Sequence, residues 1–259
     1  MLFRSEAMRR EYVKIGVPKE RLAVVPNAVD LVRFQASTNR EQTRQKHGLA
    51  PDRFVFLAVG RNHPQKDYTT LLNAALRLHR TSGMAFHLAI AGRDVGGLQP
   101  EVDRSGLNDI VRLLEIGMPE SSPPALAALQ MPPASMVDLY RAADAFVMSS
   151  LLEGFSSALL EAMAAGLPVI VTDSPGCADF VREENSGWIV PPGSPSALAQ
   201  KMGMLLQSVE VRNELATRSR QRASQFDWPV VVDRYLEIYQ NLIGGRTRAP
   251  SLRSKLKQS

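Results

Sequence analysis

Short apolar runs alternate with amphipathic stretches along most of this 259-residue chain. The apolar runs lack strict alternation, which is typical of strands that are buried on both faces. They predict strands at residues 22–25, 54–59, 87–91, 145–148, 169–172 and 188–190. The amphipathic stretches predict helices at residues 68–80, 136–143, 157–165, 178–184 and 195–206, and two more between 212 and 244. We therefore expect an α/β fold, a Rossmann-like doubly wound parallel sheet with helices on both faces, plus C-terminal helices.

Two glutamates, Glu153 and Glu161, are separated by seven residues around a predicted helix start. Either Ser156 or Ser157 can accept hydrogen bonds from the first free amides of that helix. Gly166 can end the helix in the left-handed conformation. One acid therefore precedes the helix and the other lies on its second turn, with an N-terminus that favours anions between them. This layout suits a polyhydroxyl compound that carries a diphosphate.

Ligands of open parallel sheets bind beyond the carboxyl ends of the strands. Three of the predicted loops follow strands at that edge, and they are residues 60–66, 92–97 and 149–157. Arg61, Lys66 and Glu153 can therefore converge although they are distant in sequence. A planar guanidinium suits phosphate oxygens, a lysine adds a mobile charge, and Gly60 allows close approach of the backbone.

The segment from Glu153 to Glu161, with Gly166 and Pro168 after it, resembles the E-x7-E signature of retaining glycosyltransferases of the GT-B fold, group 1 (family 4). Further segments resemble motifs of that family in the same order, at residues 25–30, 59–67, 139–144 and 187–193. The resemblance covers residues 1 to about 243. Two departures stand out, since Ala28 and Asp67 occupy positions where the family usually has glycine.

The resemblance implies how the chain divides. Residues 1–20 would be a remnant of the end of an N-terminal acceptor domain, and 21–225 a Rossmann-like domain that binds the nucleotide-sugar donor. Residues 226–244 would form a C-terminal crossover helix and 245–259 a basic, disordered tail. A complete site would then need an N-terminal acceptor domain, from the same or another chain.

The resemblance also implies an activity, the transfer of a hexose from a nucleotide-diphosphate sugar to a glycan or lipid-linked acceptor with retention. Glu153, Arg61 and Lys66 would be catalytic, and Glu153 could be nucleophile, stabiliser or hydroxyl acceptor. The alternative is a module that binds nucleotide sugars without catalysis. The choice between UDP and GDP stays open, because residues 113–117 and 126–130 compete for the strand that precedes base recognition.

For donor binding, the resemblance implies that Glu161 accepts hydrogen bonds from ribose hydroxyls. Amides around Gly154, Phe155 and Ser156 would hold sugar hydroxyls or phosphate, with Ser157 beside them and Gly60 in the phosphate loop. His63 is a weaker candidate for a phosphate contact. No D-x-D triplet and no zinc-ligand spacing occurs in the sequence, so we expect metal-independent transfer without a cofactor.

Composition and charge limit the partners and the cellular location that we expect for the chain. The net charge is +5, and part of it lies in the tail, which is a candidate for peripheral contact with anionic membrane lipids. Aromatic residues do not interleave with the basic ones, so no nucleic-acid partner is expected. The sequence has no run of about 18 apolar residues and no secretory leader pattern. With one cysteine, Cys177, expected to be a half-buried inert residue, a cytoplasmic location is predicted.

Overall fold

The computed structural model describes residues 1–35, 39–116, 132–182 and 184–243. Its centre is a six-stranded parallel sheet with the strand order β5-β4-β3-β6-β7-β8. The strands are β3 (Phe54–Val59), β4 (Phe86–Gly92), β5 (Val111–Glu115), β6 (Ala145–Met148), β7 (Val169–Thr172) and β8 (Trp188–Val190). The predicted α/β fold with a parallel sheet is confirmed.

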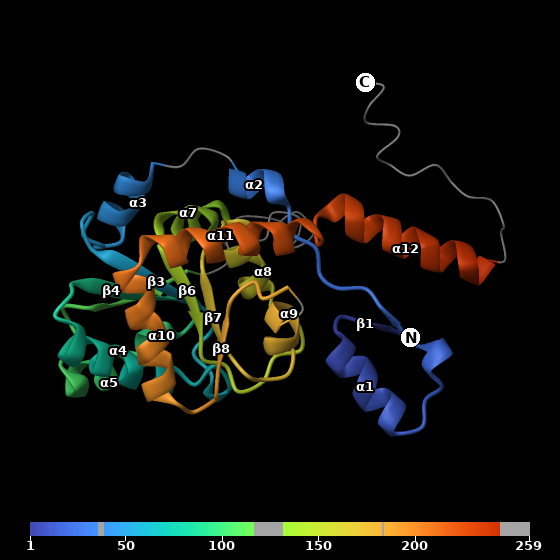
Figure 1. The fold of residues 1–259 in the computed structure, drawn as a ribbon, viewed down its shortest axis with the longest axis horizontal. Coiled ribbons are helices and arrows are strands. Elements are labelled where there is room, and N and C mark those ends of the chain that lie inside the picture. Colours follow the sequence, from blue (N-terminus) through green and yellow to red (C-terminus); the bar gives the residue numbers. More distant parts are fainter. Residues whose placement is uncertain (36–38, 117–131, 183, 244–259) are drawn as a thin grey trace.

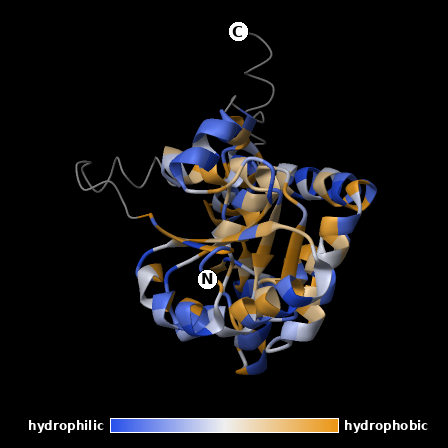
Figure 2. Cartoon of the chain, turned by 90° about the vertical axis from the view of Figure 1, so that its left-hand side faces the viewer, coloured by the Kyte–Doolittle hydropathy of each residue, from blue (hydrophilic) through white to orange (hydrophobic). Residues whose placement is uncertain are grey.

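The strands are apolar on both sides because helices cover both faces of the sheet. Every residue of β4, β6 and β7 is buried. Successive residues of β3 point into different layers, with Phe56 in one apolar cluster and Val55 and Leu57 in the other. Figure 2 shows the hydrophobic strands enclosed between helices whose outer faces are hydrophilic.

Two layers of helices enclose the sheet (Figure 1). One layer contains α4 (Tyr68–Ser82), α5 (Gln99–Ser105) and α10 (Pro195–Gln207). The other contains α2 (Leu31–Gln35), α3 (Arg40–Lys46), α7 (Ala134–Ala142), α8 (Ser157–Ala164) and α9 (Ala178–Arg182). The predicted helices all appear, within a few residues of the expected bounds. Their apolar stripes form the two clusters that flank the sheet.

Two strand assignments differ from the prediction. The expected strand at 22–25 is shorter, β2 (Ala23–Val24), and pairs with β1 (Leu2–Phe3) in a separate two-stranded sheet. The remaining strand of the main sheet is β5, which pairs with β4. Of the two segments that competed for this strand, residues 113–117 overlap β5 at positions 113–115, and residues 126–130 lie outside the described residues. The N-terminal part also contains α1 (Glu6–Lys14) and a short η1 (Lys19–Arg21).

The chain ends in the two predicted helices, α11 (Val209–Ser224) and α12 (Trp228–Ile243). The break between the two helices includes Phe226, whose carbonyl accepts a hydrogen bond from the amide of Val29 at 2.9 Å. Figure 1 shows α12 extending beyond the sheet. Val231 is its buried residue, whereas Trp228, Leu236 and Tyr239 are among its exposed apolar side chains. In the described part of the chain, no helix has the length and apolar content to cross a bilayer. The tail at 245–259 lies outside the described residues.

Candidate active site

Three loops meet at the carboxyl ends of neighbouring strands β4, β3 and β6. Backbone hydrogen bonds join the first two, from Gly60 N to Ala91 O and from Asn62 N to Arg93 O, both at 2.9 Å. The loops after β3 and β6 are joined by a hydrogen bond from Leu151 N to Gln65 O at 2.8 Å. The expectation that these segments share one edge is therefore correct, and their backbones form a single connected rim.

An ion pair at this rim joins two of the predicted site residues. Lys66 Nζ lies 2.6 Å from Glu153 Oε1, and both side chains are half-buried. The hydroxyl of Ser150, itself buried, donates to the same oxygen at 2.9 Å. Among the described residues the other carboxylate oxygen of Glu153, Oε2, has no hydrogen-bond partner. One oxygen thus fixes the carboxylate in place and the other is available to a ligand.

Glycines allow this close packing. A Cβ on Gly60 would lie 2.6 Å from Lys66 Cε, so a larger residue there would displace the lysine from its position across the end of β3. Gly176 has a φ of 79°, and a Cβ there would lie 2.1 Å from the carbonyl oxygen of Glu153. The amide of Glu153 donates to the carbonyl of Pro175 at 3.1 Å. The loop after β7 therefore contacts the backbone of Glu153, whereas Lys66 contacts its side chain.

Helix α8 begins directly behind this loop. Ser156 is its N-cap and accepts a hydrogen bond from Leu159 N at 3.3 Å. Ser157 instead accepts from Asn27 Nδ2 at 3.1 Å, so the choice between the two serines falls on Ser156. Gly166, with a φ of 76°, follows the helix in the left-handed conformation as expected. The first turn of α8 presents free amides and the positive end of the helix dipole.

Glu161 lies on the second turn of α8, in different surroundings from Glu153. The Tyr140 hydroxyl donates to Glu161 Oε2 at 2.9 Å. Burial raises the pKa of the Glu161 carboxyl to about 7, while the Tyr140 hydrogen bond and the charge of Arg33 oppose the shift. Glu161 lines a cavity of about 270 Å³ together with Asn27, Arg33 and Ser157.

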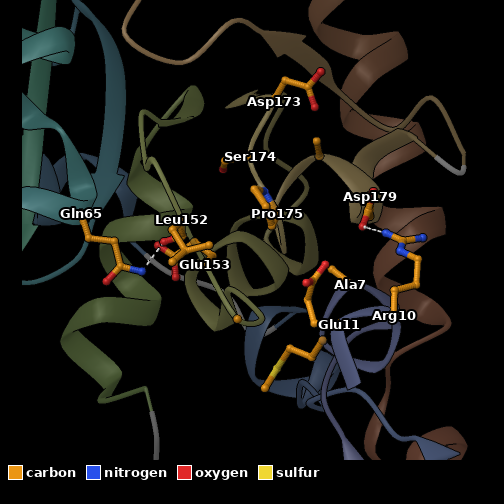
Figure 3. Close-up of a pocket in the computed structure, with 13 residues that line it drawn as sticks. Ala7, Arg10, Glu11, Gln65, Leu152, Glu153, Asp173, Ser174, Pro175 and Asp179 are labelled. Carbon is orange, nitrogen blue, oxygen red and sulfur yellow. Dashed lines mark hydrogen bonds and ion pairs between the residues drawn. The ribbon is translucent and has the colours of Figure 1, made fainter. Parts of the chain in front are cut away.

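Glu153 lines a second, larger cavity of about 590 Å³ between the rim and α1. Figure 3 shows Gln65, Leu152 and Glu153 on one side and Asp173, Ser174 and Pro175 on another, with Ala7 and Glu11 of α1 closing the space. Arg10 of α1 pairs with Asp179 of α9 at 2.6 Å, which ties the N-terminal helix to this cavity. Glu153, just before α8, thus lines one cavity, and Glu161, on α8 itself, lines the other.

The remaining predicted residues take more varied positions. Phe155 packs its ring against Phe180 at 5.5 Å, so it anchors the loop while Gly154 stays exposed. Arg61 follows β3 at the rim, but its side chain is exposed and has no hydrogen bond or ion pair among the described residues. The structure thus joins Lys66 to Glu153 and leaves the guanidinium of Arg61 apart from them. His63 is also exposed, and its Nδ1 accepts from Gln65 N at 3.3 Å.

The structure explains the unusual residue Asp67 and corrects the expected burial of Cys177. Asp67 has a φ of 48° and caps α4 by accepting from Thr70 N at 3.2 Å, so it replaces glycine as a residue that tolerates the left-handed conformation. Cys177 is fully buried, not half-buried as expected. Burial raises the pKa of its thiol to about 12, which makes the thiolate rare at neutral pH.

Sequence reasoning missed three side chains at the site. Ser150 and Tyr140 hold the two glutamates, and the Tyr68 hydroxyl donates to the carbonyl of Gly60 at 2.9 Å. From the sequence, Tyr140 is only part of the motif at residues 139–144, without a role toward Glu161, and Tyr68 resembles an ordinary core residue of an amphipathic helix. Ser150 could have been found from its position in the sequence, because it follows β6 at the edge of the sheet where the other site loops meet.

Comparison with known proteins identifies the family and agrees with this fold. Residues 39–222 match the sequence profile described as "Glycosyl transferases group 1". The chain therefore belongs to the group 1 glycosyl transferases.

Two curated relatives share the name D-inositol 3-phosphate glycosyltransferase. The chain is 30% identical over 237 residues to a D-inositol 3-phosphate glycosyltransferase of Nocardia farcinica, covering 91% of this chain and 51% of that protein. It is 33% identical over 238 residues to D-inositol 3-phosphate glycosyltransferase 1 of Catenulispora acidiphila, covering 90% of this chain and 55% of that protein. The chain thus spans about half the length of the curated relatives it matches.

Solved structures share the fold. HepE of Anabaena, solved with UDP and glucose, aligns with a TM-score of 0.77 and 22% identity over 94% of this chain and 62% of that one. The C-terminal domain of the group 1 glycosyl transferase LpcC of Francisella tularensis aligns with a TM-score of 0.60 and 24% identity, covering 76% of this chain and 97% of that domain. The fold is thus that of the C-terminal half of a GT-B glycosyltransferase.

Proposed function

We propose that this chain is the donor-binding half of a retaining hexosyltransferase that uses a nucleotide-diphosphate sugar. One observation carries the proposal, namely that the paired glutamates, one just before α8 and one on its second turn, line two different cavities. A diphosphate placed over this N-terminus would meet free amides and the Lys66 ammonium. The sugar would then extend toward Glu153 and the nucleoside toward Glu161.

The proposed roles follow from these positions. Glu161, beside Asn27 and Arg33, would accept hydrogen bonds from the ribose hydroxyls. The unused Oε2 of Glu153 would face the sugar as nucleophile, stabiliser or hydroxyl acceptor. Arg61 is exposed and free to turn toward the phosphates, where its fork would bind two oxygens.

In the reaction, the bond between the anomeric carbon and the diphosphate oxygen breaks, and an acceptor hydroxyl forms the new glycosidic bond and loses its proton. The leaving diphosphate gains negative charge, which Lys66, Arg61 and the amides of α8 would stabilise. Lys66 would exchange some of its contact with Glu153 for the phosphate. We propose that no metal ion is needed, because the sequence has no D-x-D triplet; transfer that survives EDTA supports this point.

The acceptor side would come from a second Rossmann-like domain, within a longer polypeptide or on a separate chain. The match to about half of each relative supports this proposal, as does the exposed apolar face of α12. In this division residues 1–20 belong to the end of the acceptor domain, 21–225 to the donor domain and 226–244 to the crossover helix. The acceptor would be a glycan or a lipid-linked sugar. The relatives' name makes D-inositol 3-phosphate another compound to assay.

Calorimetric titration with UDP, GDP and their hexose conjugates tests the proposal. UDP is the first nucleotide to try, because HepE was solved with UDP and glucose. We expect saturable binding that Lys66→Met weakens by at least about tenfold, since a phosphate loses its cation, while Arg104→Gln on the exposed surface of α5 leaves it unchanged. Absence of binding by every nucleotide would refute the proposal.

A second assay separates the enzyme from the module that binds without catalysis. The chain is mixed with an acceptor domain and a labelled nucleotide sugar. Transfer that Glu153→Ala abolishes supports the enzyme, and binding with no transfer under any acceptor supports the module.

A further inference from the structure

A third cavity lies at the other end of the sheet, where β3, β4 and β5 begin. It has a volume of about 520 Å³ and contains Arg53, His87 and Arg112 in its wall. These residues stand at or next to the first positions of three adjacent strands. The strand β3 has six residues, so this cavity is on the order of 17 Å from the donor rim.

Both arginines are held by neutral oxygens. Arg112 donates from Nε to Gly48 O at 2.9 Å and from one terminal nitrogen to Asn108 O at 2.7 Å. Arg53 donates to Asp109 O at 3.1 Å. Within the described residues neither guanidinium has a carboxylate within ion-pair distance. Their positions are therefore fixed while neither guanidinium is in an ion pair with a described residue, which is the preorganised state that anion binding needs.

His87 supplies the third nitrogen and is 2% exposed. Its Nδ1 lies 3.2 Å from the carbonyl of Ile110, and this contact requires a proton on Nδ1. The other nitrogen, Nε2, makes no hydrogen bond to the described residues, although the side chain lines the cavity. His87 thus uses Nδ1 for a hydrogen bond within the protein, and its Nε2 is available to an oxygen atom of a ligand that lies near the two arginines.

The charges around His87 set its protonation state. Burial lowers the pKa of its imidazole, and the nearby Arg112, Arg53 and Arg44 lower it further, against the Ile110 hydrogen bond. Arg44 is itself paired with Asp144 at 2.6 Å. Glu41 and Asp109 also line the cavity, but both are exposed at its mouth. An anion placed between the arginines would offset their repulsion and let His87 take up a proton and donate from Nε2.

We propose that this cavity binds a phosphate or sulfate group between Arg53, Arg112 and His87, independently of the donor site. The ligand is either free inorganic phosphate or the phosphate group of a small phosphorylated metabolite. Binding is linked to proton uptake by His87, so it strengthens as the pH falls.

Titration with sodium sulfate at low ionic strength tests this directly, followed by calorimetry and by the ring ¹⁵N signals of the four histidines. Sulfate keeps its charge over the range used, so a pH effect reports the protein. We expect saturation, a shift of the His87 ring signals, and binding at least about fivefold tighter near pH 6 than near pH 8. His87→Asn should remove this pH dependence.

Matched variants separate the cavity from other anion sites. Arg112→Gln should weaken sulfate binding at least about tenfold, and Arg53→Gln serves as a second variant because Arg112 also braces a loop. Arg104→Gln and Arg61→Gln should leave sulfate binding unchanged, the latter because it lies at the donor rim. Thermal melting checks that each variant is folded.

The outcomes are distinct. If Arg61→Gln removes sulfate binding and Arg112→Gln leaves it intact, the ion binds at the donor rim and the proposal is overturned. A titration without saturation also overturns it. Titrations with inorganic phosphate and with a hexose phosphate identify the source. Equal affinity indicates free phosphate, and tighter binding of the ester indicates a phosphorylated metabolite. Nucleotide binding that persists in Arg112→Gln shows that the donor proposal stands or fails separately.

Discussion

The two paired glutamates differ in how the fold holds them. Glu153 lies in a loop and shares one oxygen with Lys66 and Ser150. Glu161 lies on a helix against Tyr140, and burial raises the pKa of its carboxyl to about 7. The first is a carboxylate stabilised by a cation, and the second exchanges a proton near neutral pH.

This difference matches the two halves of the proposed ligand. The diphosphate and the reacting sugar carry or develop charge, so their end of the site contains a cation and a carboxylate in contact. The nucleoside part is neutral, and its hydroxyls need a hydrogen-bond acceptor of modest charge. The variants below test whether each glutamate depends on the surroundings described for it.

Removal of the lysine should have the largest effect on stability. Lys66→Met leaves the half-buried Glu153 carboxylate without its cation, which we expect to lower the free energy of unfolding by about 3 kcal/mol. Urea denaturation measures it. The double variant Lys66→Met/Glu153→Gln should recover at least half of that loss. A single variant that costs less than about 0.5 kcal/mol would show that the pair is only a solvated surface contact.

Gly176→Ala should distort the Glu153 loop. The new methyl would lie 2.1 Å from the Glu153 carbonyl oxygen, at a φ of 79°, so we expect a loss of about 2 to 3 kcal/mol in the free energy of unfolding and weaker nucleotide-sugar binding. Gly193→Ala is the matched control, because its φ is 64° but no atom lies within 4 Å of the new Cβ. It should cost about 1 kcal/mol and leave binding unchanged. Equal losses in the two variants would contradict the close packing against Glu153.

Glu161→Gln should change stability in a pH-dependent way. A raised carboxyl pKa means that the folded state binds more protons than the unfolded state between the ordinary value and about 7, so wild-type stability falls as the pH rises through that window. Glutamine cannot ionise, so the variant should be more stable by about 2 kcal/mol near pH 8 and nearly equal near pH 4. Denaturation at both pH values measures this. A difference that does not change with pH would refute the burial argument.

The helix cap should show the smallest effect. Ser156→Ala removes the acceptor for the Leu159 amide and should cost about 1 kcal/mol of stability. Ser157→Ala should cost less, because that exposed hydroxyl binds Asn27 instead. Thermal or urea denaturation of the two variants compares them. The reverse order would place the cap at Ser157.

Much of the fold could be predicted, because its helices and buried strands are long enough to show periodicity. The helix at Tyr68–Ser82 and the strand at Val169–Thr172 illustrate this. The pairing of β1 with β2 could not, since two residues per strand give no pattern. The strand β5 was only partly visible, because Arg112 and Glu115 interrupt its apolar residues.

The site was predictable only where strand ends fix it. Lys66 and Glu153 follow adjacent strands, so their meeting follows from sheet topology. The contact of Tyr140 with Glu161 joins two helices whose relative rotation the sequence does not specify. The cavity beside α1 likewise depends on where that helix packs. Among the described residues, the exposed side chain of Arg61 has no hydrogen bond or ion pair that would fix its direction.

A crystal structure of this chain with a nucleoside diphosphate tests the central claim most directly. We predict the diphosphate over the N-terminus of α8, with Lys66 Nζ within hydrogen-bond distance of a phosphate oxygen and the ribose beside Glu161. A diphosphate bound away from α8, with the contact between Lys66 and Glu153 unchanged, would contradict the account.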